Sequence, residues 1–224
     1  MNFEQMNNNK VYIAGRVLNE PEFSYEIFGE GFYEFNLEVK RLSETSDIIP
    51  VTISERLIKL ENIVKGSKIA GKGQFRSYNK QVEEKSKLML TVFIRELLPY
   101  DETQNPNQIE LVGFVCKEPI YRTTPFKREI SDVLIAVNRS YNKSDYLPCI
   151  AWGRNAKFVK DLQVGDKLNL SGRIQSRVYQ KKIGDVLEER VAYEISLSKI
   201  VKENNNLTNE VNNYYEVNNY YANV

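Results

Sequence analysis

The segment KVYIAGRVLNEPEFSY (10–25) recurs later in the chain as QIELVGFVCKEPIYRT (108–123), and this repeat is the main evidence for the fold. Identical residues recur 98 positions apart in the first part of the unit: Gly15/Gly113, Pro21/Pro119, Val39/Val137, Arg41/Arg139 and Pro50/Pro148. In the later part they recur 99 positions apart: Gly66/Gly165 and Gly73/Gly172. A single one-residue shift over a whole unit indicates a duplication. A two-copy repeat of this length predicts two domains rather than a solenoid.

Each copy has the same order of expected elements. In the first copy, one alternating run around a glycine, VYIAGRV (11–17), is followed by the alternating run FYEFNLEVK (32–40) and a short β-rich run beside a proline. RLIKLENIVKG (56–66) and RNAKFVKDLQVG (154–165) change to helical spacing and stop at a glycine. Two further strands close each unit. Five strands with a helix after the third predict an all-β fold of two tandem OB-type five-stranded barrels, each with one short helix.

Two domains of about 100 residues suit a chain of 224 residues. We expect a first OB domain at 1–98, a polar linker at 99–107 and a second OB domain at 108–201. The remaining segment, 202–224, is a low-complexity tail rich in Asn and Tyr, and we expect it to be disordered.

The composition excludes several classes of protein. The chain has no histidine, which removes the commonest general base and the usual zinc ligand, and we expect neither an enzyme nor a metal or other cofactor. Cys116 and Cys149 lie in apolar stretches and are interpreted as reduced, buried thiols. The start has no signal-peptide pattern, and no apolar run approaches the length of a membrane span. We expect a cytoplasmic protein that does not contact membranes.

The second copy resembles the bacterial single-stranded DNA-binding protein (SSB) family. The segments that carry this resemblance are LVGFVCKEP (111–119), IAVNRSY (135–141), YLPCIAWGRNAKFV (146–159) and VGDKLNLSGRIQSRVY (164–179). The resemblance implies non-catalytic binding of single-stranded DNA in replication, recombination or repair. Family members present four barrels, so a chain with two implies a homodimer, with a monomer as the alternative. Replication or repair proteins are further possible partners.

In this family, bases stack on a few aromatic side chains, which the resemblance places at Tyr141, Tyr146, Trp152 and Tyr179. Flat rings suit a sequence-tolerant binder, because every base has a π-face. The alternative is that these residues are ordinary core or edge aromatics of a β protein. The basic residues interleaved with them are the candidates for phosphate contacts: Arg122, Lys127, Arg128, Arg139, Lys143, Arg154, Arg173, Arg177, Lys181 and Lys182.

The first copy differs at the matching positions, which are Ser43, Ile48, Ser54 and Lys80. Tyr78 is a weaker stacking candidate, two residues before Lys80 and therefore on the same strand face. The first copy also carries an acidic stretch and a net charge of about +1 over 10–98, against about +5 over 109–199. We therefore expect the second domain to bind DNA and the first to contribute little.

Two features leave an alternative open. The family usually ends in a short acidic and hydrophobic tip, whereas this chain ends in YYANV. The degenerate first copy also suits an accessory OB protein of a primosome or mobile-element replication system, which acts mainly through protein contacts.

Overall fold

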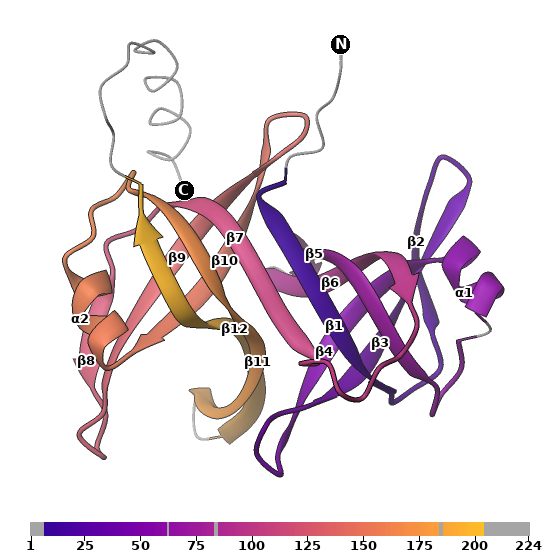
Figure 1. Cartoon of the computed structure of the whole chain (residues 1–224), viewed down its shortest axis with the longest axis horizontal. Helices are drawn as coiled ribbons and strands as arrows, with labels where there is room; N and C mark the ends of the chain where they lie inside the picture. The colour runs from indigo at the N-terminus through magenta and orange to yellow at the C-terminus, as the bar shows by residue number, and fades with distance from the viewer. Residues whose placement is uncertain (1–6, 62, 83–84, 184–185, 204–224) are drawn as a thin grey trace.

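A computed structural model describes residues 7–61, 63–82, 85–183 and 186–203. The tail was predicted to be disordered. From residue 204 onward it lies outside the described part of the chain. Barrel one comprises β1 (Asn9–Val17), β2 (Glu22–Ile27), β3 (Glu30–Lys40), β4 (Ser46–Ser54), α1 (Glu55–Glu61), β5 (Lys68–Val82) and β6 (Lys85–Leu98) (Figure 1). Barrel two comprises β7 (Asn107–Val115), β8 (Ile120–Thr123), β9 (Glu129–Arg139), β10 (Lys143–Trp152), α2 (Arg154–Lys160), β11 (Lys167–Ile183) and β12 (Val186–Lys202).

The predicted all-β fold with one short helix in each copy is confirmed, with one addition. Each barrel has a further short strand, β2 or β8, that pairs antiparallel with the long strand after it. In barrel one the hairpin turns through Phe28 and Gly29, whose φ angles of 52° and 79° form the tight two-residue turn that matches strand twist. The sequence analysis did not assign these strands, although EFSYEI in β2 alternates polar and apolar residues and Gly29 marks the turn after it; β8 has only four residues.

Glycines mark the points where each barrel closes. A Cβ on Gly15 would lie 2.2 Å from the Glu38 carbonyl oxygen, where β1 pairs with β3. Gly73 and Gly172 lie at matching register shifts in the β5–β6 and β11–β12 hairpins. At either position a Cβ would approach a backbone oxygen to within about 2 Å. These contacts explain why the repeat keeps its glycines.

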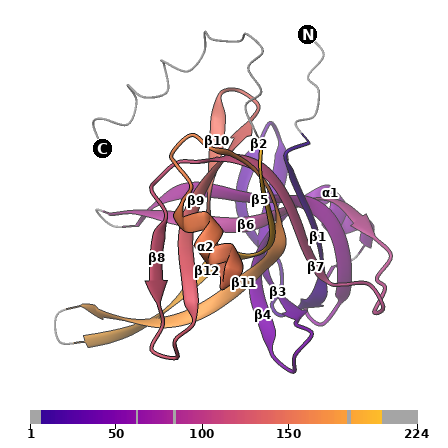
Figure 2. The ribbon, with the colours of Figure 1, turned by 60° about the vertical axis from the view of Figure 1, so that its left-hand side comes forward.

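The two barrels share one continuous sheet. β1 and β7 pair antiparallel from Asn9↔Leu111 to Ile13↔Asn107, which joins the barrels at the centre of the molecule (Figures 1 and 2). The strand order is β2-β3-β4-β6-β5-β1-β7-β11-β12-β10-β9-β8, with β3–β1 and β7–β9 pairings closing the barrels. The short strands β2 and β8 are therefore the two ends of the sheet.

Repeat-related asparagines tie each barrel internally in the same way. Asn9 donates from Nδ2 to the Phe75 carbonyl (2.7 Å) and accepts from its N–H (3.0 Å). Asn107 makes the same pair of bonds with Ile174, at 2.7 and 2.9 Å. Because these amides are buried, each bond satisfies a backbone group that would otherwise be costly to bury. The side chains of Phe75 and Ile174 are themselves fully buried in the core.

Candidate nucleic-acid interface

Alternate residues of β9 and β10 face the core of barrel two and its outer face, and Ile130 and Ile150 are the two residues of the outer face that are nevertheless buried. On β10, Leu147, Cys149 and Ala151 point into barrel two and are buried. Tyr146 and Trp152 belong to the opposite face, where Trp152 is 39% exposed and Tyr146 is partly buried. These two aromatics are therefore outward residues of a strand whose core contacts are made by its other side.

The strand register places a basic residue in the same row as the tryptophan. Trp152 lies opposite Ile130 on β9, and Ile130 lies opposite Arg122 on β8. A row across three neighbouring strands spans roughly 10 Å. Arg122 is exposed, and its Nε also donates to Asp132 at 2.9 Å. A stacked base and the phosphate next to it can therefore both be reached from this row.

Tyr141 projects from the tip of the β9–β10 turn. It is 81% exposed, and both Tyr141 and Asn142 have positive φ angles, 63° and 53°. Left-handed backbone is costly for a tyrosine and is common where a side chain serves a function. The turn holds this ring beyond the wall of the barrel.

Tyr179 lies on β11 within a groove of about 1010 Å³. The Arg177 guanidinium lies 5.7 Å from the centre of the Tyr179 ring, and both side chains belong to the same strand face. Barrel two contributes Arg122, Leu134, Pro148, Arg177, Tyr179 and Arg190 to this groove, and barrel one contributes residues that include Glu34, Pro50 and Lys87. The groove brings Arg122, Arg177 and Tyr179 together.

The ten basic candidates fall into two groups. Lys127, Arg128, Lys143, Arg154, Lys181 and Lys182 are exposed, and the structure shows no ion pair for them within the described residues. The other four pair with carboxylates: Arg122 with Asp132, Arg139 with Asp145, Arg173 with Asp47 and Arg177 with Glu194. The first group is electrostatically free to meet a phosphate, whereas Arg139 and Arg173 are partly buried at the junction of the barrels.

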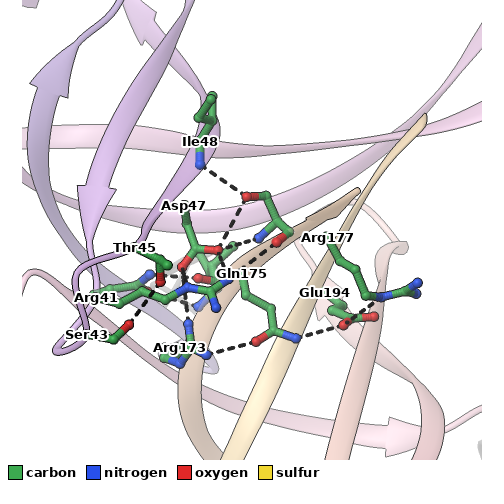
Figure 3. Close-up of polar contacts among 12 residues, drawn as sticks. Arg41, Ser43, Thr45, Asp47, Ile48, Arg173, Gln175, Arg177 and Glu194 are labelled. Atoms are coloured by element: carbon green, nitrogen blue, oxygen red, sulfur yellow. Dashed lines mark hydrogen bonds and ion pairs between the residues drawn. The ribbon is translucent and has the colours of Figure 1, made fainter. Parts of the chain in front are cut away.

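Asp47 forms a first lock between the barrels (Figure 3). Its buried carboxylate accepts from Arg41 of its own barrel at 2.6 and 2.8 Å. From barrel two it accepts from Arg173 Nη1 at 3.1 Å and from the Ser176 backbone N–H at 2.8 Å. Arg173 also donates to the side-chain oxygen of Gln175 at 3.0 Å, and the Gln175 amide in turn donates to Glu194 at 2.7 Å. Glu194 pairs with Arg177, so this polar chain ends at the groove.

Asp145, the residue that corresponds to Asp47 in the second copy, forms a second lock with the roles of the two barrels exchanged. It accepts from the backbone N–H of Ser77 in barrel one at 2.8 Å and from Arg139 at 3.3 Å. The Ser77 hydroxyl accepts from the Tyr146 backbone N–H at 2.8 Å. In the first lock, Ser176 accepts from the Ile48 N–H in the same manner, at 3.1 Å. Burial raises the pKa of the Asp145 carboxyl, and the bonds from Ser77 and Arg139 oppose that shift. Barrel one therefore positions a predicted stacking residue of barrel two.

Barrel one lacks an open platform at the matching positions. Ser54 is buried, and Ile48 and Lys80 are exposed. Tyr78 is 37% exposed, but its hydroxyl donates to Glu34 at 3.1 Å, and burial together with Glu34 raises the pKa of Tyr78 to about 12.

Barrel one has instead an aromatic cluster that the sequence analysis did not single out. Tyr25 stacks on Phe32 at 5.0 Å between ring centres, and Phe32 lies 5.6 Å from Phe93. The Arg76 guanidinium lies 4.3 Å from the Phe93 ring centre. Desolvation by burial and the charges of neighbouring arginines lower the pKa of Arg76 to about 10. These rings face one another, so they anchor the β2–β3 hairpin.

Metal binding, cysteine chemistry and membrane insertion were also considered for the described residues. They contain no group of three or more His, Cys, Asp or Glu side chains arranged to hold a metal ion. Both cysteines are free, and burial raises the pKa of each thiol. Neither helix in this part of the chain is long and apolar enough to cross a membrane.

Comparison with known proteins decides the family. The family model for single-strand binding proteins matches residues 106–203. Single-stranded DNA-binding protein B of Bacillus subtilis is 35% identical over 85 residues, which cover 35% of this chain and 75% of that protein. The chain belongs to the single-strand binding protein family. Members of this family bind DNA without catalysis, which confirms the prediction that the chain is not an enzyme.

Further comparisons define how far the likeness extends. Single-stranded DNA-binding protein 1 of Staphylococcus aureus is 34% identical over 85 residues, and the chain spans only about half of its length (51%). The structure of the single-stranded DNA binding protein from Thermus aquaticus superposes with a TM-score of 0.68 at 20% identity. That match covers 90% of this chain and 95% of the other, so the fold is shared over both barrels.

Proposed function

We propose that this chain binds single-stranded DNA without catalysis and with little sequence specificity, through the outer face of barrel two. The observation that carries the proposal is the outward placement of Tyr146 and Trp152 on a strand whose inward residues fill the core. Each base stacked on an aromatic ring contributes about 1–3 kcal/mol, whichever base it is.

Charge supports the same face. Basic residues lie beside the aromatic ones: Arg122 in the row of Trp152, Arg177 against Tyr179, and exposed lysines at 143, 181 and 182. Neutralising phosphates with such residues releases counterions and provides affinity that does not depend on sequence. Tyr141 and Arg154 extend this set at the turn and at the start of α2.

We further propose that the chain acts in replication, recombination or repair inside the cell, as a homodimer that presents four barrels and recruits proteins of those pathways. A second candidate, an accessory role through protein contacts, is favoured by barrel one. Its acidic β2–β3 hairpin and its closed aromatic cluster suit a protein partner better than a polyanion.

Fluorescence titration of the full chain separates these candidates. Binding of oligo(dT) should quench Trp152, with higher affinity than for a duplex of the same length. The logarithm of affinity should fall with the logarithm of salt concentration, with a slope of about −0.7 per phosphate contacted. Equal affinity for duplex and single strand would contradict the proposal, and absence of binding to either would favour the accessory role. Light scattering should give twice the 26.1 kDa of one chain for the homodimer.

A further inference from the structure

The molecule has an open sheet edge at each end. β2 and β8 terminate the shared sheet, and they lie at opposite ends of the long axis in Figure 1. All six residues of β2 are exposed, as are three of the four in β8. The described strands pair with only one side of each, so the other side presents unpaired backbone groups that can accept a further strand.

The two edges carry opposite charge. Residues 17–39, which include the β2–β3 hairpin, contain six glutamates and no lysine or arginine. Glu22, Glu26 and Glu30 make no ion pair within the described residues. Residues 119–128, which form β8 and its turn, contain Arg122, Lys127 and Arg128 and no acid.

The duplication has kept an exposed phenylalanine at the tip of both hairpins. Phe28 and Phe126 are related by the repeat offset, and their side chains are 105% and 86% exposed. Phe23, at 60%, and Ile120, at 63%, extend these apolar surfaces along β2 and β8. Exposed apolar side chains gathered at a charged edge are typical of an interaction surface rather than of chance exposure.

We propose that the β2–β3 hairpin of one chain docks on the β8–β9 hairpin of a second copy, so that chains associate head to tail. Like edges repel, because β2 against β2 sets glutamates together and β8 against β8 sets basic residues together. The unlike edges attract and can continue the sheet from one molecule to the next. Because the two edges lie at opposite ends of the molecule, each such contact leaves one edge of each kind free, and further chains can add to form an open chain.

The contact should be weak and sensitive to salt. β8 has only four residues, so the interface falls in the small class, below about 1,200 Å². Its charged residues are exposed, so added salt screens their attraction within about 10 Å at 0.1 M. The association does not depend on DNA binding, and it differs from the closed homodimer because its size keeps growing with concentration.

Sedimentation velocity without DNA tests this association. At low salt, the weight-average mass of the full chain should continue to rise with concentration, and high salt should abolish the rise. Glu22→Lys/Glu26→Lys and Lys127→Glu/Arg128→Glu should each lose it. The first variant makes strand β2 itself basic, so that it meets the basic β8 edge, and the second gives the β8 turn two acids that meet the glutamates of β2. An equimolar mixture of the two variants should regain it, because unlike edges meet again. Regain also shows that both variants are folded.

A matched control and two contrary outcomes complete the experiment. Glu44→Lys/Glu96→Lys makes the same change of charge at exposed positions away from the edges and should keep the wild-type rise. A constant mass for the wild-type chain at low salt would overturn the proposal, and so would a mixture that behaves as its separate components. If Lys127→Glu/Arg128→Glu weakens oligo(dT) binding while the wild-type mass stays constant, the basic hairpin serves DNA instead.

Discussion

Barrels one and two are copies of one unit that have kept the same buried contacts and changed their outer faces. Asp47 and Asp145, which are related by the repeat offset of 98, accept equivalent hydrogen bonds from a serine N–H of the other barrel. On the outer face, by contrast, Trp152 corresponds to a buried serine, Ser54. The constraint on the junction is mutual, because each lock needs residues from both copies. The outer faces have no such constraint and can diverge.

The comparison also shows that barrel one contributes to the site without forming it. Ser77 accepts from the Tyr146 N–H and donates its own N–H to Asp145, so it fixes one end of β10. The β1–β7 ladder joins the two barrels further. Either half expressed alone would lose these partners, so the roles of the barrels are best tested by matched substitutions in the full chain.

The largest expected difference between the barrels is in DNA affinity. Trp152→Ala/Tyr179→Ala removes two stacking surfaces and should weaken oligo(dT) binding by about 2–6 kcal/mol. The matched variant Tyr25→Ala/Tyr78→Ala should cost less than about 1 kcal/mol, because these rings contact Phe32 and Glu34 in an acidic surrounding. Anisotropy of labelled oligo(dT) measures both. Equal losses would show that barrel one also binds.

The next difference concerns stability. Asp47→Ala leaves Arg41, Arg173 and the Ser176 N–H without their shared acceptor, and should lower the free energy of unfolding by about 3 kcal/mol. Asp145→Ala should cost about 2 kcal/mol, because Asp145 has one arginine partner at a longer distance. Urea denaturation of both variants gives their free energies of unfolding. A larger loss for Asp145→Ala than for Asp47→Ala would show that Asp47 is not the stronger contact between the barrels.

A smaller effect should separate the two serines of the locks. Ser77→Ala and Ser176→Ala each remove one hydrogen bond and should cost similar stability, about 1 kcal/mol. Only Ser77→Ala should also weaken oligo(dT) binding, by less than one stack, because Ser77 holds Tyr146 whereas Ser176 holds Ile48. Titrations of the two variants side by side test this, and identical affinities would show that Tyr146 needs no support from barrel one.

The smallest expected effect is a dependence on pH. Because burial raises the pKa of Asp145, the folded state holds this proton more tightly than the unfolded chain does. The contribution of Asp145 is therefore greatest in acid, below the ordinary pKa of an aspartate, and declines as pH rises through the raised value. Asp145→Asn removes this dependence. The difference in free energy of unfolding between wild type and variant should thus fall as pH rises, and a constant or increasing difference would contradict the direction of the shift.

Much of the fold followed from the repeat, because punctuation by Gly15/Gly113 and Gly73/Gly172 reflects the close approaches that barrel closure requires. The outward placement of Tyr146 and Trp152 could not be read from the sequence, because they lie in an apolar run in which Cys149, Ile150 and Ala151 are all buried. The locks could not be predicted, because Asp47 meets Ser176 only through the arrangement of the barrels, 129 residues apart in sequence. For the same reason, the pairing of Arg173 with Asp47 of the other barrel was not visible among the basic candidates.

Photo-cross-linking of the unmodified full chain to oligo(dT), with the adducts located by mass spectrometry, tests most directly whether barrel two holds the DNA. We expect adducts on the outer face of barrel two, at Tyr141, Tyr146, Trp152 and Tyr179. Adducts concentrated instead on Tyr25, Phe32 and Tyr78 of barrel one would contradict this expectation.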